Sequence, residues 1–181
     1  MKTSPNAHLT HCYSAELTMD IRFRPFAESD LIRVRALHIR SFAELAQADH
    51  SGEQIAGHLA YIASGDYEGE VKGANLQLAE TPDGVLVGTA GWQDAGPGVA
   101  RIRKVFVAPA RARQGLGRRL VAEVEQRAVE AGYERFTVRA NINAVPLYAA
   151  MGYEETGRGS MDVGNGISLP VVFMQKLHAT R

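Results

Sequence analysis

The segment Val105-Phe-Val-Ala-Pro-Ala-Arg-Ala-Arg-Gln-Gly-Leu-Gly-Arg-Arg-Leu120 joins a predicted strand to a predicted helix. Its first three residues are β-branched or aromatic and favour a strand, and Pro109 ends that strand because it has no backbone N–H to donate. Apolar residues then recur mostly at steps of three and four over 116–131, which predicts an amphipathic helix that Gly132 closes with a left-handed backbone. The sequence therefore predicts a strand, a glycine turn and a helix as one unit.

The turn between strand and helix contains Arg113, Gln114, Gly115, Leu116 and Gly117. Glycine has no Cβ, so a ligand can approach the backbone closely, and the first amides of a helix have no partner within the helix. These free donors and the helix dipole favour an anion at this point. The turn therefore indicates a site for an anionic group such as a diphosphate.

The charge around the turn supports the same interpretation. Arg111 and Arg118 flank the turn, and the segment 101–139 has ten Arg and Lys residues against four Glu, a net charge of +6 (10 − 4). A solvated charged face is the other interpretation of this excess, and a tight turn without a ligand is the other interpretation of the glycines. The dinucleotide fingerprint fits worse because Leu120 stands at its third glycine, and the P-loop sequence Gly-Lys-Ser/Thr is absent.

The segment 105–120 resembles the acetyl-CoA-binding motif of the GCN5-related N-acetyltransferases (GNATs). That motif reads Arg/Gln-x-x-Gly-x-Gly/Ala after a strand that ends in aromatic-Val-x-Pro. Gly115 and Gly117 match its glycines, whereas Ala112 stands at the first position and arginines lie to either side of it. The departure leaves the backbone of the turn intact and concerns one side-chain contact.

A second stretch, Asn141-Ile-Asn-Ala-Val-Pro-Leu-Tyr-Ala-Ala-Met-Gly-Tyr153, resembles the family's Asn-x-x-Ala-x-x-Leu-Tyr-x-x-x-Gly-Phe/Tyr segment. The two motifs occur in the family's order, and the resemblance covers residues 20–177. It implies one α/β domain over 20–181: a single mixed sheet, mostly antiparallel, with one parallel strand-helix-strand unit and helices on both faces. Residues 1–19 have no periodicity and are expected to form a flexible tail.

The resemblance also implies a reaction with acetyl-CoA as co-substrate. In the family a neutral amine attacks the thioester directly, without a covalent enzyme intermediate, and a backbone N–H binds the oxyanion where the strand before the turn bulges. A tyrosine that matches Tyr148 protonates the leaving thiolate, since a phenol with an ordinary pKa of about 10 is protonated at neutral pH. The residues implied in binding acetyl-CoA are Val105, Phe106, Val107, Arg113, Gln114, Gly115, Leu116, Gly117, Arg118, Asn141 and Asn143.

The group that deprotonates the amine is left open. Many members of the family place a Glu on the strand before the glycine turn, but Arg101 stands at the matching position. Glu80, Asp94, His50 or bulk water remain as candidates for the base. His50 is of most interest among the histidines because it lies in the break between two predicted helices, the pair that closes over the acceptor in the family and should decide specificity.

Two candidates keep a second interpretation. Tyr148 also fits a core aromatic beside Leu147, and Asn143 also fits a residue that caps a short helix or satisfies its own turn. In both cases the local pattern alone does not separate a structural role from contact with the co-substrate.

The remaining elements follow from alternation, periodicity and turn residues. The expected strands are 21–25, 75–79, 85–92, 99–107, 136–138, 153–158 and 167–177, the last interrupted by Pro170. The expected helices run from Ser29 to about Ala46, and from a capping box at Ser51 and Gln54 to Ile62, with a short helix capped by Asn143. Residues 66–73 are rich in Gly and charge and are expected to form a loop.

Composition bounds the class of protein. The chain has 181 residues, 45% of them hydrophobic, and no net charge, so it can bury one core and shows no bulk attraction to nucleic acid or membranes. Cys12 is the only cysteine, which excludes internal disulfides and thiolate metal sites, and no apolar run reaches 18 residues. A cytoplasmic protein is expected.

The sequence therefore predicts an acetyl-CoA-dependent N-acetyltransferase that acts on an amine of a small molecule or peptide. Two alternatives stay open: a non-enzymatic acyl-CoA-binding or regulatory module, which Arg101 in place of Glu makes conceivable, and a protein-lysine acetyltransferase. The expected partners are acetyl-CoA and the amine, with neither nucleic acid nor membrane, and a homodimer is an open question.

Overall fold

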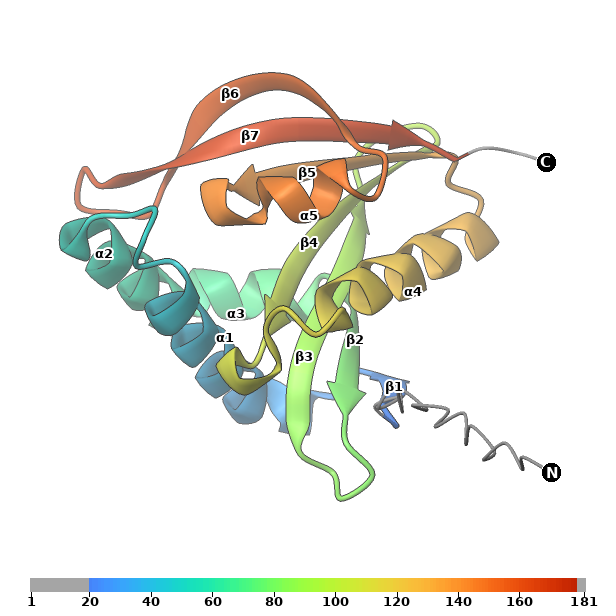
Figure 1. Ribbon diagram of the computed structural model, residues 1–181, viewed down its shortest axis with the longest axis horizontal. Coiled ribbons are helices and arrows are strands. Elements are labelled where there is room, and N and C mark those ends of the chain that lie inside the picture. The colour runs from blue at the N-terminus through green and yellow to red at the C-terminus, as the bar shows by residue number, and fades with distance from the viewer. Residues whose placement is uncertain (1–19, 179–181) are drawn as a thin grey trace, which may run out of the picture.

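The computed structural model of the protein describes residues 20–178, and the predicted tail 1–19 lies outside them. The described chain forms a seven-stranded sheet in the order β1-β2-β3-β4-β5-β7-β6 (Figure 1). All neighbouring strands are antiparallel except β4 and β5, which are parallel. The strands are β1 (Arg22–Pro25), β2 (Asn75–Glu80), β3 (Leu86–Asp94), β4 (Val99–Val107), β5 (Arg135–Asn141), β6 (Glu154–Asp162) and β7 (Ser168–Leu177). The predicted mixed sheet with one parallel unit is confirmed.

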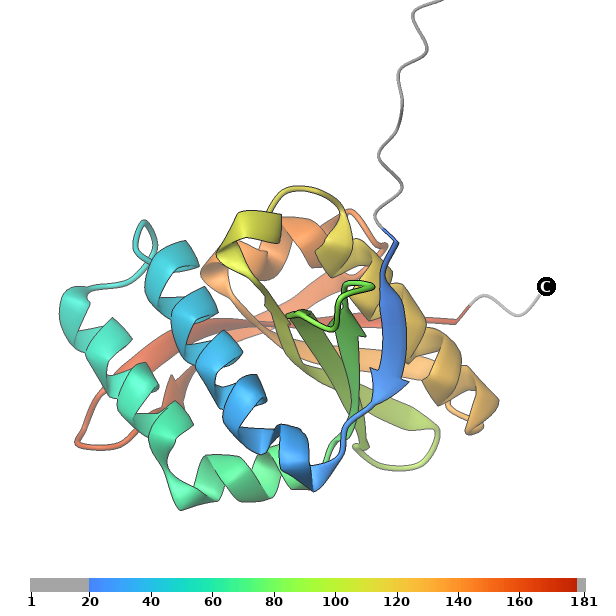
Figure 2. The same cartoon turned by 90° about the horizontal axis from the view of Figure 1, so that it is seen from below.

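Helices cover both faces of the sheet, as predicted. Helix α1 packs on β3 and β4 from one side, and α4 packs on β2, β3 and β4 from the other (Figure 2). The helices are α1 (Leu31–Leu45), α2 (Gly52–Ala63), α3 (Gly65–Lys72), α4 (Leu116–Glu130) and α5 (Val145–Ala149), with 3-10 turns at Glu28–Asp30, Pro109–Arg111 and Ile142–Ala144. No helix between residues 20 and 178 combines the length and the apolar character that crossing a bilayer requires.

The strand-turn-helix unit has the predicted form. Strand β4 ends at Val107, two residues before Pro109, and α4 begins after Gly115, whose φ is +81°. The apolar stripe of α4 is buried, with Leu116 and Leu120 at 0% exposure, and Gly132 follows the helix with a φ of +90°. The sheet and α4 therefore share one continuous core that fixes the direction of the glycine turn.

The parallel strands β4 and β5 pair over only part of their length. The pairing runs from Val99 with Arg135 to Ile102 with Val138, and beyond that point the two strands make no further pairs. Strand β5 instead continues along β7 as far as Asn141. A gap therefore opens in the middle of the sheet, between the second half of β4 and the end of β5.

Strand β4 contains a β-bulge at the start of this gap. Its register with β3 shifts by one residue between the pair Gly91 and Arg103 and the pair Thr89 and Phe106. Lys104 lies in the shifted stretch and has a φ of +55°, an uncommon backbone conformation for a residue with a side chain. The bulge turns the strand locally and changes where its amides and carbonyls point.

The prediction of a loop over 66–73 is wrong, because residues 66–72 belong to helix α3 and Gly73 is its C-cap. Its N-cap is Ser64, whose hydroxyl accepts a hydrogen bond from the N–H of Tyr67. Tyr67 and Val71, four residues apart, are buried at 1% and 0% exposure. Two apolar anchors and a cap therefore outweigh the glycines at 65, 69 and 73, which had favoured a loop.

Three local predictions also need correction. Ser29 does not cap α1, because Asp30 stands at the N-cap and its carboxylate accepts from the N–H of Ala27. Asn143 does not cap α5, because it lies inside a 3-10 turn and Ala144 is the N-cap. Pro170 does not interrupt β7. Strand β5 ends at Asn141, which pairs with Val171, so Pro170 has a strand neighbour only on the β6 side, as a residue at a sheet edge does.

The capping box and the hairpin are confirmed. The hydroxyl of Ser51 accepts from the N–H of Gln54, and the N–H of Ser51 donates to the Gln54 side chain. Strands β2 and β3 form the predicted antiparallel hairpin, with Asn75 opposite Trp92. These signals are local in sequence, which explains why they can be read without tertiary information.

Candidate active site

A pocket of about 170 Å³ opens where β4 and β5 diverge. Its walls come mainly from the β4 stretch 101–106, the β5 stretch 138–141, residues of α2 and α3, and Tyr148 of α5, and they are completed by Ala144, Met161 and Val171. The α2 and α3 side chains are His58, Tyr61, Tyr67 and Glu70. The pocket is thus formed by residues that lie up to 113 positions apart in the sequence, from His58 to Val171 (171 − 58).

The predicted strand residues Val105, Phe106 and Val107 are close to this pocket. Val105 and Phe106 line it directly, and Val107 ends β4 beside the glycine turn. The ring of Phe106 stacks on His38 of α1 at 4.0 Å between centroids. Backbone amides next to the bulge therefore lie along the wall of the pocket.

The glycine turn presents an uncapped helix N-terminus. No side chain caps α4 at Gly115, and a Cβ at that residue would have no neighbour within 4 Å. Arg113 and Arg118 are exposed, and Arg113 itself has a φ of +62°. Gln114 donates to the carbonyl of Ala110, so its side chain holds the loop. Donors and cations therefore gather at one exposed point, as an anionic ligand requires.

Two residues of the turn are placed differently from their neighbours. The Leu116 side chain is fully buried in the core, so only its backbone faces the turn. A Cβ on Gly117 would lie 3.4 Å from Leu147 of α5 and 3.7 Å from Val107 of β4. Gly117 therefore packs close to both the end of β4 and α5, where a side chain would contact them.

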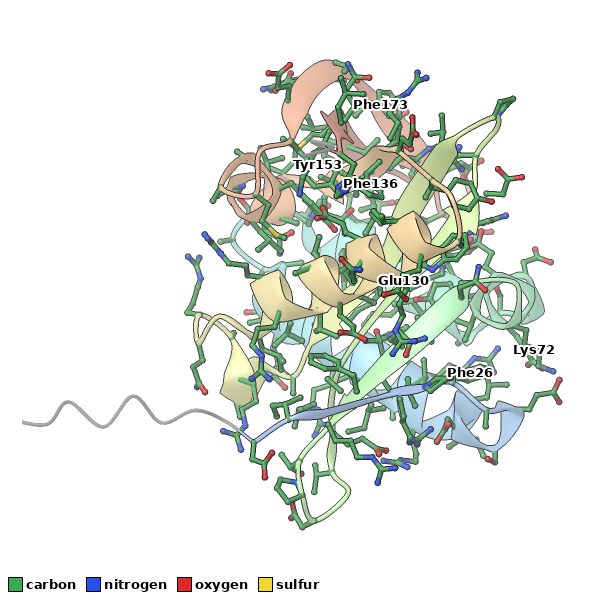
Figure 3. The ribbon with its side chains drawn as sticks, turned by 90° about the vertical axis from the view of Figure 1, so that its right-hand side faces the viewer. Phe26, Lys72, Glu130, Phe136, Tyr153 and Phe173 are labelled. Carbon is green, nitrogen blue, oxygen red and sulfur yellow. The ribbon has the colours of Figure 1, made fainter. Side chains whose placement is uncertain are left out.

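Tyr148 of α5 lines the pocket and is the residue that follows Leu147. Its side chain is 3% exposed, and its ring packs edge-on against Tyr153 at 5.3 Å between centroids. Figure 3 shows Tyr153 between α4 and the strands of the sheet's far edge, where its hydroxyl donates to Glu125 at 2.7 Å. The hydroxyl of Tyr148 has no hydrogen-bond partner within residues 20–178 and is not sealed from solvent. It therefore points into the pocket that it lines.

The electrostatic surroundings keep the Tyr148 phenol protonated. Burial raises the pKa of Tyr148 above its ordinary value, and the nearby carboxylate of Glu125 raises it further. A phenol in this state can donate a proton at every pH near neutrality.

The two asparagines occupy different places. Asn141 ends β5 and lines the pocket. Asn143 donates its side-chain amide to the carbonyl of Leu45, 3.1 Å away at the end of α1, and does not line the pocket. Asn143 thus connects the turn before α5 to the first helix.

The proposed bases lie away from the pocket. Glu80 accepts hydrogen bonds from Arg24 and Arg33, at the first strand and helix, and these bonds hold its pKa below the ordinary value even though burial acts in the opposite direction. Asp94 accepts from the N–H of Gly96 in the β3–β4 turn. His50 packs against Phe42 with neither ring nitrogen hydrogen-bonded. None of the three candidates lines the pocket.

Sequence reasoning missed a charged cluster at the pocket wall. The carboxylate of Glu70 accepts from Tyr61 Oη at 2.6 Å, from Arg103 Nη2 at 2.5 Å and from Lys104 Nζ at 2.5 Å. Burial would raise the pKa of Glu70, but the hydrogen bonds from Lys104 and Tyr61 outweigh it and the net shift is downward. Burial lowers the pKa of Lys104 to about 8, against the opposing effect of Glu70. Glu70 was hidden because its segment had been assigned to a loop.

The sequence also did not predict a buried chain of hydrogen bonds. Tyr67 Oη and His38 Nδ1 lie 2.8 Å apart, His38 Nε2 and Thr89 Oγ1 lie 2.7 Å apart, and Thr89 Oγ1 donates to the carbonyl of Lys104 at 2.8 Å. Because the Thr89 hydroxyl donates to a carbonyl, it accepts from His38, whose Nδ1 in turn accepts from Tyr67. Burial lowers the pKa of His38 well below its ordinary value, which keeps the ring neutral as this chain requires.

The comparisons with known proteins agree with this fold. Residues 46–177 match the family model of the acetyltransferase (GNAT) domain, and the chain therefore belongs to the GNAT acetyltransferase family. The comparison with curated proteins found no match.

Solved structures give the same family. The chain is similar to a GCN5-related N-acetyltransferase from Rhodopseudomonas palustris, with a TM-score of 0.77 and 26% identity over 86% of this chain and 94% of that one. The fold is also shared with yncA, a putative acetyltransferase from Salmonella typhimurium solved with acetyl-CoA (TM-score 0.61, 20% identity, 90% and 96% covered). A third structure is paia N-acetyltransferase from Thermoplasma acidophilum with coenzyme A (TM-score 0.62, 16% identity, 88% and 100% covered).

Proposed function

We propose that the protein is an acetyl-CoA-dependent N-acetyltransferase that transfers the acetyl group directly to an amine. The observation that carries the proposal is the pocket lined by Tyr148 in the gap between β4 and β5, on the same strand that leads into the uncapped N-terminus of α4 at Gly115. Membership of the GNAT acetyltransferase family and solved relatives with acetyl-CoA or coenzyme A support it.

In this proposal the glycine turn holds the diphosphate of acetyl-CoA. The amides of the first turn of α4 would donate to the phosphate oxygens, and the guanidinium groups of Arg113 and Arg118 would add charge. The pantetheine arm would pass Gly117 and lie between Val107 and Asn141, in the gap left where β4 and β5 stop pairing. The thioester would then lie beside the bulge.

The chemistry needs three groups. The nitrogen of the neutral amine attacks the thioester carbon, a C–N bond forms, and the carbonyl π electrons move to oxygen. A backbone N–H near Val105 and Phe106, oriented by the bulge, would stabilise this oxyanion. As the intermediate collapses, the C–S bond breaks and the thiolate takes the proton of Tyr148. The ammonium proton goes to water, since the pocket wall holds no carboxylate free of a cation among the described residues.

The reaction can be tested by two linked measurements. Calorimetric titration of acetyl-CoA into the purified protein should show a single binding site, and a panel of amines should release free thiol from the complex. Binding together with thiol release supports the transferase. The absence of acetyl-CoA binding would contradict the assignment of the glycine turn.

A second candidate function rests on Arg101. This residue lines the pocket where many family members would have a Glu, which would suit a module that binds acyl-CoA without turnover. Such a module would bind acetyl-CoA but would release no thiol with any of the amines, and Tyr148→Phe would then change nothing. A turnover that depends on Tyr148 would exclude it.

A further inference from the structure

We propose that the acceptor is an amine that also carries a carboxylate, as amino acids do, and that Arg101 and Arg139 bind this carboxylate. The inference rests on the proposed transferase function and names the class of its second substrate. Four cationic side chains line the pocket, namely Arg101, Arg103, Lys104 and Arg139, whereas Glu70 is its only acidic side chain among the described residues. The formal charge of this wall is therefore +3 (4 − 1).

The four cationic side chains of the pocket differ in whether a carboxylate pairs with them. Arg103 and Lys104 share the carboxylate of Glu70, each at 2.5 Å. Within residues 20–178, Arg101 and Arg139 have neither an ion pair nor a side-chain hydrogen bond with another residue. Burial lowers the pKa of Arg101, and the adjacent charges of Arg139 and Arg103 lower it further, as expected for cations gathered without an anion.

The strand register explains why these arginines lie together. In the parallel pair Arg101 stands beside Thr137, and the next pair is Ile102 with Val138. Side chains alternate along each strand, so Arg101, Arg103 and Arg139 lie on one face of the sheet, opposite to the buried Ile102. Two unpartnered guanidinium groups on one wall match the planar, bidentate geometry of a carboxylate.

The phosphates of acetyl-CoA do not account for these two arginines. Arg101 and the end of β4 at Val107 are separated by six residues of strand, roughly 20 Å at about 3.3 Å per residue. The diphosphate-binding turn lies beyond Val107, and the 3′-phosphate of the co-substrate lies on the far side of the diphosphate from the thioester. Arg101 and Arg139 are therefore on the acceptor side of the reacting carbon.

The positive charge of the pocket also affects the protonation state of the acceptor amine, for which the described residues of the pocket offer no unpaired carboxylate as base. A cationic pocket disfavours an ammonium ion and lowers its pKa, so a larger share of the bound amine is neutral and able to attack. A carboxylate on the acceptor would offset the repulsion and fix the amine in the pocket. An acceptor with several positive charges and no anionic group would be repelled.

The first experiment measures thiol release with matched pairs of acceptors. Glycine, β-alanine, glutamate and methionine are each compared with the amide that replaces the α- or terminal carboxylate, and each kcat/KM is expressed per neutral amine, because the amide lowers the pKa of a nearby amine. We expect kcat/KM for at least one free acid to exceed that of its amide by about tenfold or more, because charge-assisted hydrogen bonds to the carboxylate are lost in the amide. Arg101→Gln and Arg139→Gln should each reduce this preference. Arg135→Gln, which changes an exposed arginine of the same strand outside the pocket, should not.

A second experiment needs no turnover. The N-acetyl forms of the same acids and amides are titrated calorimetrically into the protein saturated with coenzyme A. The proposal predicts that N-acetyl acids bind about tenfold or more tightly than their amides, and that Arg101→Gln abolishes the difference. Equal binding of acids and amides, or binding of neither, would overturn the proposal. Failure of the underlying function is distinguishable, since it would appear as absent binding of coenzyme A before any acceptor is added, or as acetyl-CoA binding without thiol release from any amine.

Discussion

The hydroxyl of Thr89 in β3 donates a hydrogen bond to the carbonyl of Lys104 in β4, with 2.8 Å between the oxygens. This bond fixes the carbonyl of the one β4 residue with a positive φ, at the bulge beside the pocket. Thr89 is itself fully buried and accepts from His38, so the bulge is connected to α1 and, through Tyr67, to α3. The helices that follow β1 therefore help to hold the strand on which the proposed oxyanion site depends.

Thr89→Val should weaken this arrangement without changing the shape of the residue. The valine leaves the His38 N–H and the Lys104 carbonyl without partners, at a cost of about 1–3 kcal/mol in the free energy of unfolding. If the bulge orients the oxyanion donor, kcat should also fall while the Kd of acetyl-CoA stays constant. Urea unfolding and thiol-release kinetics measure the two effects. Thr89→Ser keeps the hydroxyl and should restore both, and an unchanged kcat in the valine variant would contradict the positioning role.

Tyr148→Phe should reduce kcat by about 10²–10⁴-fold, the range expected for a lost general acid, and leave the Kd of acetyl-CoA unchanged. Burial raises the pKa of Tyr148, so the wild-type acid remains protonated and should cause no fall in kcat between pH 7 and 9. Tyr133→Phe is the matched control because Tyr133 packs on Trp92, away from the pocket. A kcat that falls equally in both variants would exclude a specific role for Tyr148.

Gly117→Val should remove acetyl-CoA binding and keep the fold. A Cβ at this residue would lie 3.4 Å from Leu147 and 3.7 Å from Val107, and the added methyl groups would block the approach of a ligand to the backbone of the turn. Calorimetry should show a loss of affinity of about 100-fold or more, about 2.7 kcal/mol. Gly52→Val is a suitable control, because Gly52 also lies in the first turn of a helix and has nothing within 4 Å of its Cβ position. Normal affinity in Gly117→Val would mean that the co-substrate takes another path.

Local signals explain which parts of the fold could be predicted. Pro109, Gly132 and the Ser51–Gln54 capping box act within a few residues of themselves, and each is found where the sequence placed it. The α3 helix was missed because its stability comes from the burial of Tyr67 and Val71, a tertiary effect that the glycine-rich composition obscured. The same error hid Glu70 from the list of candidate site residues.

The residues of the pocket likewise divide into those that the sequence predicts and those that it does not. Tyr148 and Asn141 could be found because they belong to a motif of fixed spacing. The cluster of Arg101, Arg103 and Arg139 could not, because it depends on the parallel register of β4 and β5, and no sequence signal specifies which residues of two strands stand side by side. Glu80 was a reasonable candidate base by residue type, yet its partners belong to β1 and α1.

Glu80→Gln should therefore lower stability and leave turnover unchanged. The Glu80 side chain is 11% exposed and pairs with Arg24 and Arg33, and Arg24 also pairs with the buried Asp30. Breaking such a cluster should cost about 3–5 kcal/mol in the free energy of unfolding, measured with urea. Glu68→Gln breaks the solvent-exposed pair with Lys72 and should change the free energy of unfolding far less than Glu80→Gln does. A large fall in kcat for Glu80→Gln in the folded protein would return Glu80 to the list of candidate bases.

The buried His58 should make the protein less stable in mild acid. Its side chain is 4% exposed, and burial, followed by the charge of Lys104, lowers its pKa from 6.5 to about 4. His58 is therefore protonated below about pH 6.5 in the unfolded chain but only below about pH 4 in the folded protein. Because the unfolded chain binds more protons between these two values, the free energy of unfolding falls as the pH decreases from about 6.5 to about 4. The loss attributable to His58 is about 3 kcal/mol, at about 1.4 kcal/mol per pKa unit. Urea unfolding at pH 7, 5.5 and 4.5 should show a steeper decline for the wild type than for His58→Phe, which keeps a ring beside Phe42 but cannot titrate. Parallel declines in the two proteins would show that His58 is protonated equally easily in both states.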